Sequence, residues 1–380
     1  MFRIAKREKA SITDSIRFRS LGFLAGLLLS MGFIAVLGYN PFSALVTLLI
    51  GAFGTGTGLR NTLTFAIPLA TTALGLSVAF RMKYWNIGGE GQLLIGATAA
   101  MFVSLVAGEN TSGWILVPMM LLFGFIGGAW YALIPGLFRV YFRTNETLFT
   151  LMMNYLAIAF VKYLYHVLWK DPLKSGFPGI RSIQEQAGLP RILGVSAGII
   201  VPVILMIVLY VLISRTKPGY EIRVVGESEP TAHYAGMNVQ KIMVGGIILS
   251  GGIVGLAGAV KLSGETLTLT ESLGGGTGFT AIVIAWLANL SAPIILVVSF
   301  LFAALQQGAQ IIQLRLNVPA AVAEIIKGLM LMSFLGSEFF LRYRIIFNKR
   351  DKSQSYPQIL SASQSSDIET DKTPDKEVKP

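Results

Sequence analysis

The chain has 380 residues, of which 53% are apolar and only 13% are charged, and its mean hydropathy is +0.64. A soluble protein carries about 25% charged residues, so this composition excludes a chain that mostly faces water. The net charge of +11 does not indicate a nucleic-acid partner, because Lys and Arg lie in short segments between apolar runs. Cysteine is absent and there are two histidines, so we expect neither disulfides nor a metal site, and no cofactor.

Long runs without Asp, Glu, Lys or Arg predict membrane-spanning helices, which need about 20 apolar residues each. These runs cover residues 20–59, 61–80, 91–108, 192–214, 242–260 and 272–314. They predict an all-α, polytopic transmembrane helical bundle of about ten spans with broken or re-entrant segments. The predicted spans are residues 21–38, 62–80, 92–107, 114–136, 147–169, 196–213 and 242–260, two in the uncharged stretch that ends at 314 and is broken near 289–293, and 318–341. Residues 42–53 are expected to form a short interfacial segment.

Basic residues mark the cytoplasmic ends of the spans, as in Arg81 and Lys83, and Arg139 and Arg143. This pattern places both termini in the cytoplasm. The first apolar run exceeds the ~7–15-residue core of a signal peptide, so we interpret it as a span. The predicted regions are a basic N-terminus at 1–20, a transmembrane domain at 21–341 with a cytoplasmic loop at 214–240, and a cytoplasmic disordered tail at 342–380.

Two segments interrupt the apolar pattern with glycines. One is Trp85-Asn86-Ile87-Gly88-Gly89-Glu90-Gly91-Gln92, and the other is Leu273-Gly274-Gly275-Gly276-Thr277-Gly278-Phe279. Non-helical backbone at membrane depth is tolerated only where protein surrounds it or where it lines a cavity. Glycine-broken segments in matching places of two halves point to a transport site. The alternative is two ordinary turns between helices.

Polar side chains inside apolar runs form the predicted substrate pathway. These residues are Asn86, Glu90, Gln92, Asn154, Trp286, Asn289, Gln306 and Gln310. They could bind a polyhydroxylated solute, or they could link helices by hydrogen bonds. Glu324 and Lys327 are three residues apart, which favours a local ion pair over a transport role. Repeated small residues, as in Gly124/Gly128 and Gly251/Gly255, predict close helix packing.

The sequence contains no G-x-x-x-x-G-K-[ST] phosphate loop, no HExxH and no G-x-S-x-G element. We therefore expect no ATPase site and no catalytic residues in this chain.

Two motifs carry a resemblance to a known family. The segment 86–92, followed by Leu93-Leu94-Ile95-Gly96-Ala97, resembles the N-I-G-x-E-G-Q signature of bacterial nucleoside-type ABC importer permeases, which are related to the ribose and branched-chain amino-acid permeases. Residues 226–237 resemble that family's G-x-N-x-x-A-A-x-Y-A-G-I segment, and residues 249–259 continue the match. The resemblance covers about residues 20–340. It departs from the family pattern at 279–282 and 286–289, where the pathway is expected.

The resemblance implies that the inner loop contains a short coupling helix that docks into an ATPase. Its residues would be Glu227, Ser228, Glu229, Pro230, Thr231, Ala232, Tyr234 and Gly236. It further implies a separate ABC ATPase subunit, a second permease subunit in a homo- or heterodimer, an extracellular solute-binding (lipo)protein and surrounding membrane lipid.

The resulting expectation is the permease subunit of an importer in the bacterial plasma membrane, forming the pathway for nucleosides. A simple-sugar permease is the alternative solute class. An ion-coupled secondary transporter, with Glu90 as the membrane-embedded acid, is an alternative mechanism. A membrane-bound enzyme or assembly scaffold is a third alternative function.

Overall fold

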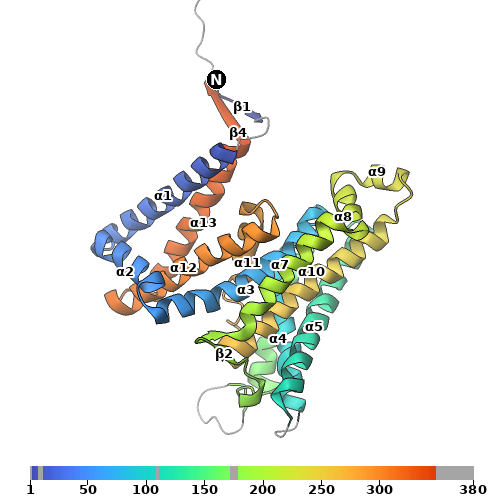
Figure 1. Ribbon diagram of the computed structural model, residues 1–380, viewed down its shortest axis with the longest axis horizontal. Coiled ribbons are helices and arrows are strands. Elements are labelled where there is room, and N and C mark those ends of the chain that lie inside the picture. The colour runs from blue at the N-terminus through green and yellow to red at the C-terminus, as the bar shows by residue number, and fades with distance from the viewer. Residues whose placement is uncertain (1, 7–11, 108–110, 172–178, 348–380) are drawn as a thin grey trace, which may run out of the picture.

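The computed structural model describes residues 2–6, 12–107, 111–171 and 179–347, and the chain in these ranges is almost entirely helical (Figure 1). The α-helices are α1 Ile12–Val36, α2 Pro41–Phe53, α3 Gly56–Arg81, α4 Gly89–Val106, α5 Gly113–Phe142, α6 Glu146–Tyr163, α7 Ile200–Arg215, α8 Lys217–Glu227, α9 Glu229–Tyr234, α10 Val239–Lys261, α11 Thr277–Leu287, α12 Ala292–Leu316 and α13 Ala320–Arg342. The short elements are the π-turns η1 Leu164–Leu168 and η4 Leu262–Thr266, the 3-10 turns η2 Glu185–Ala187 and η3 Ala197–Ile199, and the strands β1 Phe2–Lys6, β2 Arg191–Ile192, β3 Val195–Ser196 and β4 Tyr343–Phe347.

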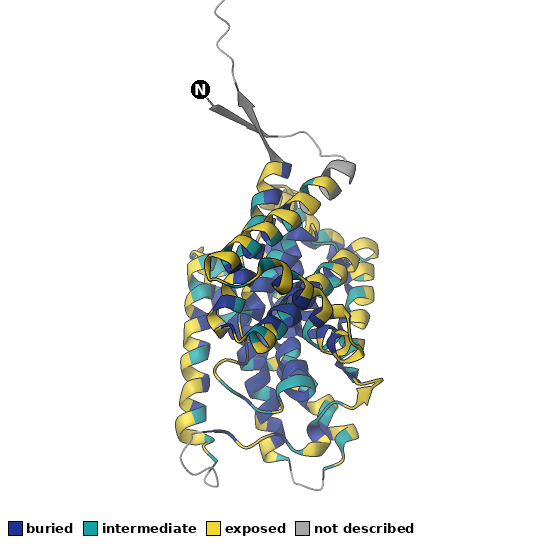
Figure 2. Cartoon of the chain, turned by 90° about the vertical axis from the view of Figure 1, so that its left-hand side faces the viewer, coloured by how far each residue is buried: buried dark blue, intermediate teal, exposed yellow. Residues whose placement is uncertain are grey.

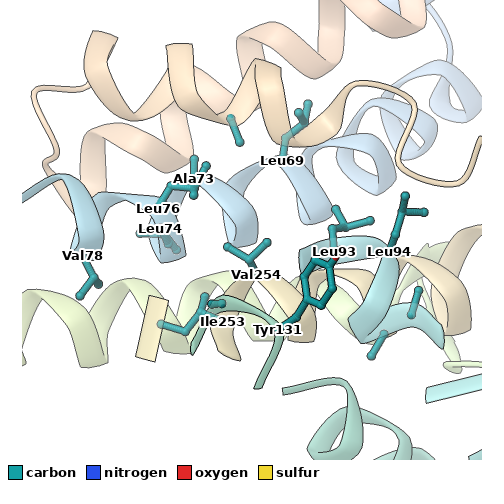
Figure 3. Packing of buried hydrophobic residues seen from close by; sticks show 14 of the residues in the cluster. Leu69, Ala73, Leu74, Leu76, Val78, Leu93, Leu94, Tyr131, Ile253 and Val254 are labelled. Carbon is teal, nitrogen blue, oxygen red and sulfur yellow. The ribbon is translucent and has the colours of Figure 1, made fainter. Parts of the chain in front are cut away.

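The core lies where α3, α4, α5 and α10 pack side by side. Leu93, Tyr131 and Val254 come from three different helices and meet beside α3 (Figure 3). Glycines bring the backbones together: a Cβ added at Gly96 would lie 2.2 Å from the carbonyl oxygen of Gly255, and one at Gly258 would lie 2.0 Å from that of Leu93. The predicted small-residue pairs also meet, since a Cβ added at Gly128 would lie 2.3 Å from the carbonyl oxygen of Gly251. The predicted close packing is therefore confirmed.

A second group, α1, α2, α12 and α13, lies to one side of this bundle (Figure 1). Gly22 and Gly26 of α1 pack against Ser337 and Met330 of α13, which also follows the small-residue pattern. α12 contacts both α2 and α3, so it joins the two groups. The expected ion pair is present, with 2.7 Å between Lys327 Nζ and Glu324 Oε2.

Many large apolar side chains are exposed, as expected for helices that contact lipid. Exposed residues lie on the outward sides of the helices and buried residues lie inside the bundle (Figure 2). Among the described residues, seven helices are long and apolar enough to cross a membrane. The helix over Ala197–Arg215, which contains α7, is only 22% buried along its most apolar stretch, whereas α3 is 78% buried along the corresponding stretch. The bundle thus has a central helix, α3, and peripheral helices such as α7.

Helices occur at the predicted spans in the predicted order, and seven of the ten are long and apolar enough to cross a membrane within the described residues. The eighth expected span is α11, an 11-residue helix of about 16 Å, which is half the hydrocarbon thickness. α11 therefore crosses only together with the irregular segment 267–276 before it, because glycines interrupt the helix there.

The two strand pairs were not predicted. β1 pairs antiparallel with β4, so the two ends of the described chain lie together, at the end of the molecule that also carries α9 (Figure 1). β4 lies within the predicted disordered tail at 342–380, and residues 348–380 of that tail lie outside the described residues.

Candidate transport site and coupling segment

The turn between α3 and α4 runs back into the bundle before α4 begins. A Cβ on Gly89 would lie 3.2 Å from Leu76, which is five residues before the end of α3. Five helical residues correspond to about 8 Å, so α4 starts well inside the bundle. The buried side chain of Asn86 closes this turn by accepting a hydrogen bond from Gly88 N (3.0 Å).

The amides of Asn86 and Gln92 pair with each other across the turn. Asn86 Nδ2 donates to Gln92 Oε1 and Gln92 Nε2 donates to Asn86 Oδ1, both at 3.1 Å. Both side chains are buried, and buried amides need such partners. The spacing of this Asn and Gln thus has a local structural reason.

α6 holds the same turn from the other side. Asn154 Nδ2 donates to the carbonyl of Ile87 (2.9 Å) and its Oδ1 accepts from Gly91 N (2.8 Å). Thr150 Oγ1 accepts from Ile87 N (3.1 Å). Of the predicted pathway residues, the structure therefore brings Asn86, Gln92 and Asn154 into one network, in which their polar groups serve the backbone and each other.

Glu90 connects the two glycine-broken segments. Its buried carboxylate accepts from Gly276 N (2.9 Å) and Gly278 N (2.6 Å) at the N-terminus of α11. The positive end of a helix dipole and two backbone donors stabilise a carboxylate. Gly278 is so close that a Cβ there would lie 2.3 Å from Glu90 N. The two breaks, 188 residues apart in the chain, form one site.

Lys261, at the end of α10, contacts the same loop, and the sequence analysis had not selected it. Its buried Nζ donates to Thr277 Oγ1 (3.1 Å) and to the carbonyl of Gly274 (3.4 Å). An ionisable residue inside a bundle is costly and is tolerated when it is partnered. The available signal was its position directly after the uncharged run 242–260 and before the glycine loop.

Trp286 lies on α11 near the α3–α4 turn. Its ring stacks on Trp85, with 5.2 Å between ring centroids and 17° between planes, and also contacts Phe80 at 5.6 Å. The second half of α11 is thus attached to the turn that precedes Asn86.

The remaining predicted pathway residues lie elsewhere. Asn289 has φ +49° in the turn between α11 and α12, at the opposite end of α11 from Glu90. Gln306 and Gln310 lie on α12, where Gln306 is half-buried and Gln310 exposed. Within the described ranges of the chain, the side chains of Gln306 and Gln310 make no hydrogen bond.

The predicted coupling residues form a short exposed helix, α9, that projects from the bundle (Figure 1). Ser228 caps it by accepting from Thr231 N (3.3 Å), and Pro230 occupies its first turn. Ala232 is fully buried against Val225 and Val239, whereas Tyr234 is 96% exposed. The helix therefore has one side anchored and one side free.

Glu227, Glu229 and Gly236 lie around this anchored helix. The carbonyl of Glu227 accepts from Lys83 Nζ (3.1 Å). Glu229 lies 3.9 Å from Arg139, which also pairs with Glu146 at 3.1 Å. Gly236 ends the segment with φ +74°, a conformation that glycine adopts without strain.

α8 ties this segment to the end of α3. A Cβ on Gly226 would lie 1.8 Å from the carbonyl oxygen of Arg81, so the two backbones are in direct contact. The guanidinium of Arg81 in turn donates to the carbonyl of Leu290, after α11. A contiguous series of contacts thus runs from α9 through α8 and α3 to α11, whose far end holds Glu90.

Glycine-broken helices that meet inside a bundle of membrane-spanning helices are typical of membrane transport proteins. The model of the family "Branched-chain amino acid transport system / permease component" matches residues 58–335. The chain belongs to this family of ABC transporter permeases, and it is a multi-pass membrane protein of the bacterial plasma membrane.

Three curated relatives are similar over most of their length. A glucose ABC transporter permease of Haloferax volcanii is 30% identical, over 85% of this chain and 88% of the relative. A guanosine ABC transporter permease of Bacillus subtilis is 30% identical, over 85% and 92%. A nucleoside ABC transporter permease of Lactococcus lactis subsp. cremoris is 28% identical, over 76% and 81%.

Proposed function

We propose that this chain forms the membrane pathway for nucleoside uptake in an ATP-binding-cassette importer. The observation that carries the proposal is the series of contacts from the exposed helix α9 to the Glu90 site. Such a series lets a movement outside the membrane reach a buried break, as rigid-body coupling requires. The guanosine and nucleoside permeases among the relatives support the solute class.

The proposal includes three partners. α9 presents Tyr234 and Glu229 to a separate ATPase subunit, which supplies the ATP hydrolysis that this chain is not expected to perform. A second permease subunit, identical or related, would complete the pathway, and an extracellular solute-binding protein would deliver the solute. The exposed side of α9 supports the first of these, since Ala232 already anchors the other side.

In the proposed mechanism the Glu90 site is a junction that moves as a unit. Closure of the ATPase displaces α9, and α8 transmits the displacement to α3 through the Gly226–Arg81 contact. Arg81 then shifts the α11–α12 turn. α11 moves with that turn, so its N-terminus is displaced relative to Glu90 and Lys261. The pathway residues would then open on one side of the membrane or the other.

A simple sugar is the second candidate solute, because the glucose permease of Haloferax volcanii is as similar to the chain as the guanosine permease. Uptake of radiolabelled guanosine, by cells expressing the chain with its ATPase and binding protein, distinguishes the two. We expect unlabelled nucleosides to compete and glucose or ribose not to compete. Competition by sugars alone would overturn the nucleoside assignment.

The energy source is tested in the same cells. An ATP-driven importer stops when ATP is depleted and survives collapse of the ion gradients. The reverse result would indicate a secondary transporter, in which Glu90 would have to exchange its two backbone donors for an ion.

A further inference from the structure

A cavity of about 210 Å³ opens between the ends of α3, α7 and α8 and the α11–α12 turn. Its polar lining combines two guanidinium groups with hydroxyl groups. These come from Arg81 and Arg223, and from Ser77, Tyr210, Ser214 and Ser291. The remaining lining includes aliphatic side chains and the Asn289 turn, and no carboxylate lines the cavity.

Both arginines keep donors available for a ligand. Arg81 donates to the carbonyl of Leu290, which uses part of a guanidinium with five N–H groups. Arg223 is exposed on α8. Across the described residues, neither arginine lies within 4 Å of a carboxylate, whereas Lys217 on the same helix pairs with Glu221 at 3.8 Å. The cavity is therefore positively charged without an internal counter-ion.

The N-terminus of α12 adds to this positive field. Ser291 caps α12 without a side-chain hydrogen bond, and both Ser291 and Ala292 line the cavity. The first N–H groups of a helix and its dipole favour an anion at this place. The Ser77 and Ser214 hydroxyls already donate to the carbonyls of Leu74 and Tyr210. Two guanidinium groups, the hydroxyls of Tyr210 and Ser291 and a helix N-terminus remain, and this donor set suits the tetrahedral oxygens of a phosphate.

The position of the cavity indicates where the phosphate comes from. Arg81 and Arg215 end α3 and α7 at the end of the molecule that carries α8 and α9 (Figure 1). Tyr210, on one wall, is exposed on α7, the peripheral helix that faces outward from the bundle. The basic residues at this end of the helices are those expected on the cytoplasmic side of the membrane. Anionic headgroups accumulate at that boundary, and basic pockets between helices bind them.

We propose that this cavity is a phosphate-binding site, occupied in the membrane by the headgroup of an anionic phospholipid of the cytoplasmic leaflet. The bound headgroup would neutralise Arg81 and Arg223. Since Arg81 contacts both α8 and the α11–α12 turn, the lipid would stabilise the series of contacts that links α9 to the Glu90 site.

The test is a titration of the purified full-length chain with phosphatidylglycerol, followed by native mass spectrometry. Arg223→Gln should weaken binding about fivefold, since one arginine near the surface contributes about that factor. Arg223→Lys, which keeps the charge, should restore most of it. The matched control is Arg215→Gln, which removes an exposed arginine at the same level that does not line the cavity. Phosphatidylcholine should show no difference between the variants.

A second arm uses radiolabelled inorganic phosphate in equilibrium dialysis. If phosphate binding depends on Arg223 whereas phosphatidylglycerol binding does not, the phosphate site is supported and the lipid source is overturned. If Arg215→Gln weakens phosphatidylglycerol binding as much as Arg223→Gln does, or if neither variant changes it and inorganic phosphate does not bind, the site itself is overturned.

Discussion

The α3–α4 turn and the α9 segment are both short interruptions between long helices, yet they use their polar groups in opposite ways. At the turn, Asn86, Glu90 and Gln92 are buried. Asn86 and Gln92 are hydrogen-bonded to each other, and Glu90 is hydrogen-bonded to Gly276 and Gly278. In α9, one residue, Ala232, is buried, and Tyr234 is almost fully exposed. The comparison indicates that the buried break is a structural joint, whereas the exposed one is free to be the surface that we propose for the ATPase.

Substitutions in the two segments should therefore have different effects on stability and on transport. A change in the turn should lower the stability of the chain and transport together. A change in α9 should lower transport and leave stability nearly intact. The predictions below test this distinction, in order of the expected effect on stability.

The largest effect is expected for Gly278→Ala. The added methyl group would lie 2.3 Å from Glu90 N, where backbone rather than a flexible side chain must move. Such overpacking costs about 3 kcal/mol of folding free energy and separates α11 from α4. The apparent melting temperature of the purified chain in detergent should fall, and uptake should be lost.

The control for this variant is Gly245→Ala in α10. It makes the same chemical change within a helix, and no atom lies within 4 Å of the added Cβ. Both substitutions gain the same helix propensity, so the difference between them isolates the contact with Glu90. Equal melting temperatures would show that the stability of the chain does not depend on the close approach of Gly278 to the backbone of Glu90.

The second prediction compares Glu90→Gln with Glu324→Gln. The first replaces a buried charge that accepts two backbone hydrogen bonds, which contributes about 2 kcal/mol. The second breaks an ion pair whose glutamate is 70% exposed, which contributes less than about 1 kcal/mol. Uptake and melting temperature should fall more for Glu90→Gln. Equal losses in the two variants would remove the special role of Glu90.

The sequence predicts the order of the helices but not the contact between the two glycine-broken segments. The order of helices follows from uncharged runs and basic ends, which are local properties. The glycines and Glu90 indicated that residues 86–92 and 273–279 are unusual. Their contact could not be predicted, because Gly278 and Glu90 are 188 residues apart and no local pattern encodes such a pairing.

The polar residues show the same limit. Asn86, Gln92 and Asn154 were selected because an amide in an apolar run needs a partner, and that reasoning left open whether the partner is solute or protein. The structure supplies protein partners for all three. Lys261 was overlooked because it ends an apolar run, where lysine usually reaches toward water. Only the fold shows that it turns inward to Thr277.

The third prediction concerns the double variant Glu229→Ala, Gly236→Ala. Loss of the 3.9 Å ion pair with Arg139 costs less than about 1 kcal/mol because both side chains are partly exposed. An alanine at φ +74° costs about 1 kcal/mol, and nothing lies within 4 Å of its Cβ. We expect a small decrease in melting temperature, normal membrane insertion and loss of ATP-driven uptake. Normal uptake and normal ATPase association would contradict the coupling assignment.

The smallest effect on stability is expected for Tyr234→Ala. The ring is 96% exposed, so its removal leaves the packing of Ala232 against Val225 unchanged, and the melting temperature should stay the same. If α9 is the surface for the ATPase, the same substitution should weaken copurification of that subunit, since aromatic side chains often anchor protein interfaces. Tyr220→Ala, an exposed tyrosine on α8 outside the predicted docking residues, is the matched control. A loss of ATPase association in both variants would mean that the docking surface extends beyond α9 onto α8, whereas no loss in either would separate α9 from the ATPase altogether.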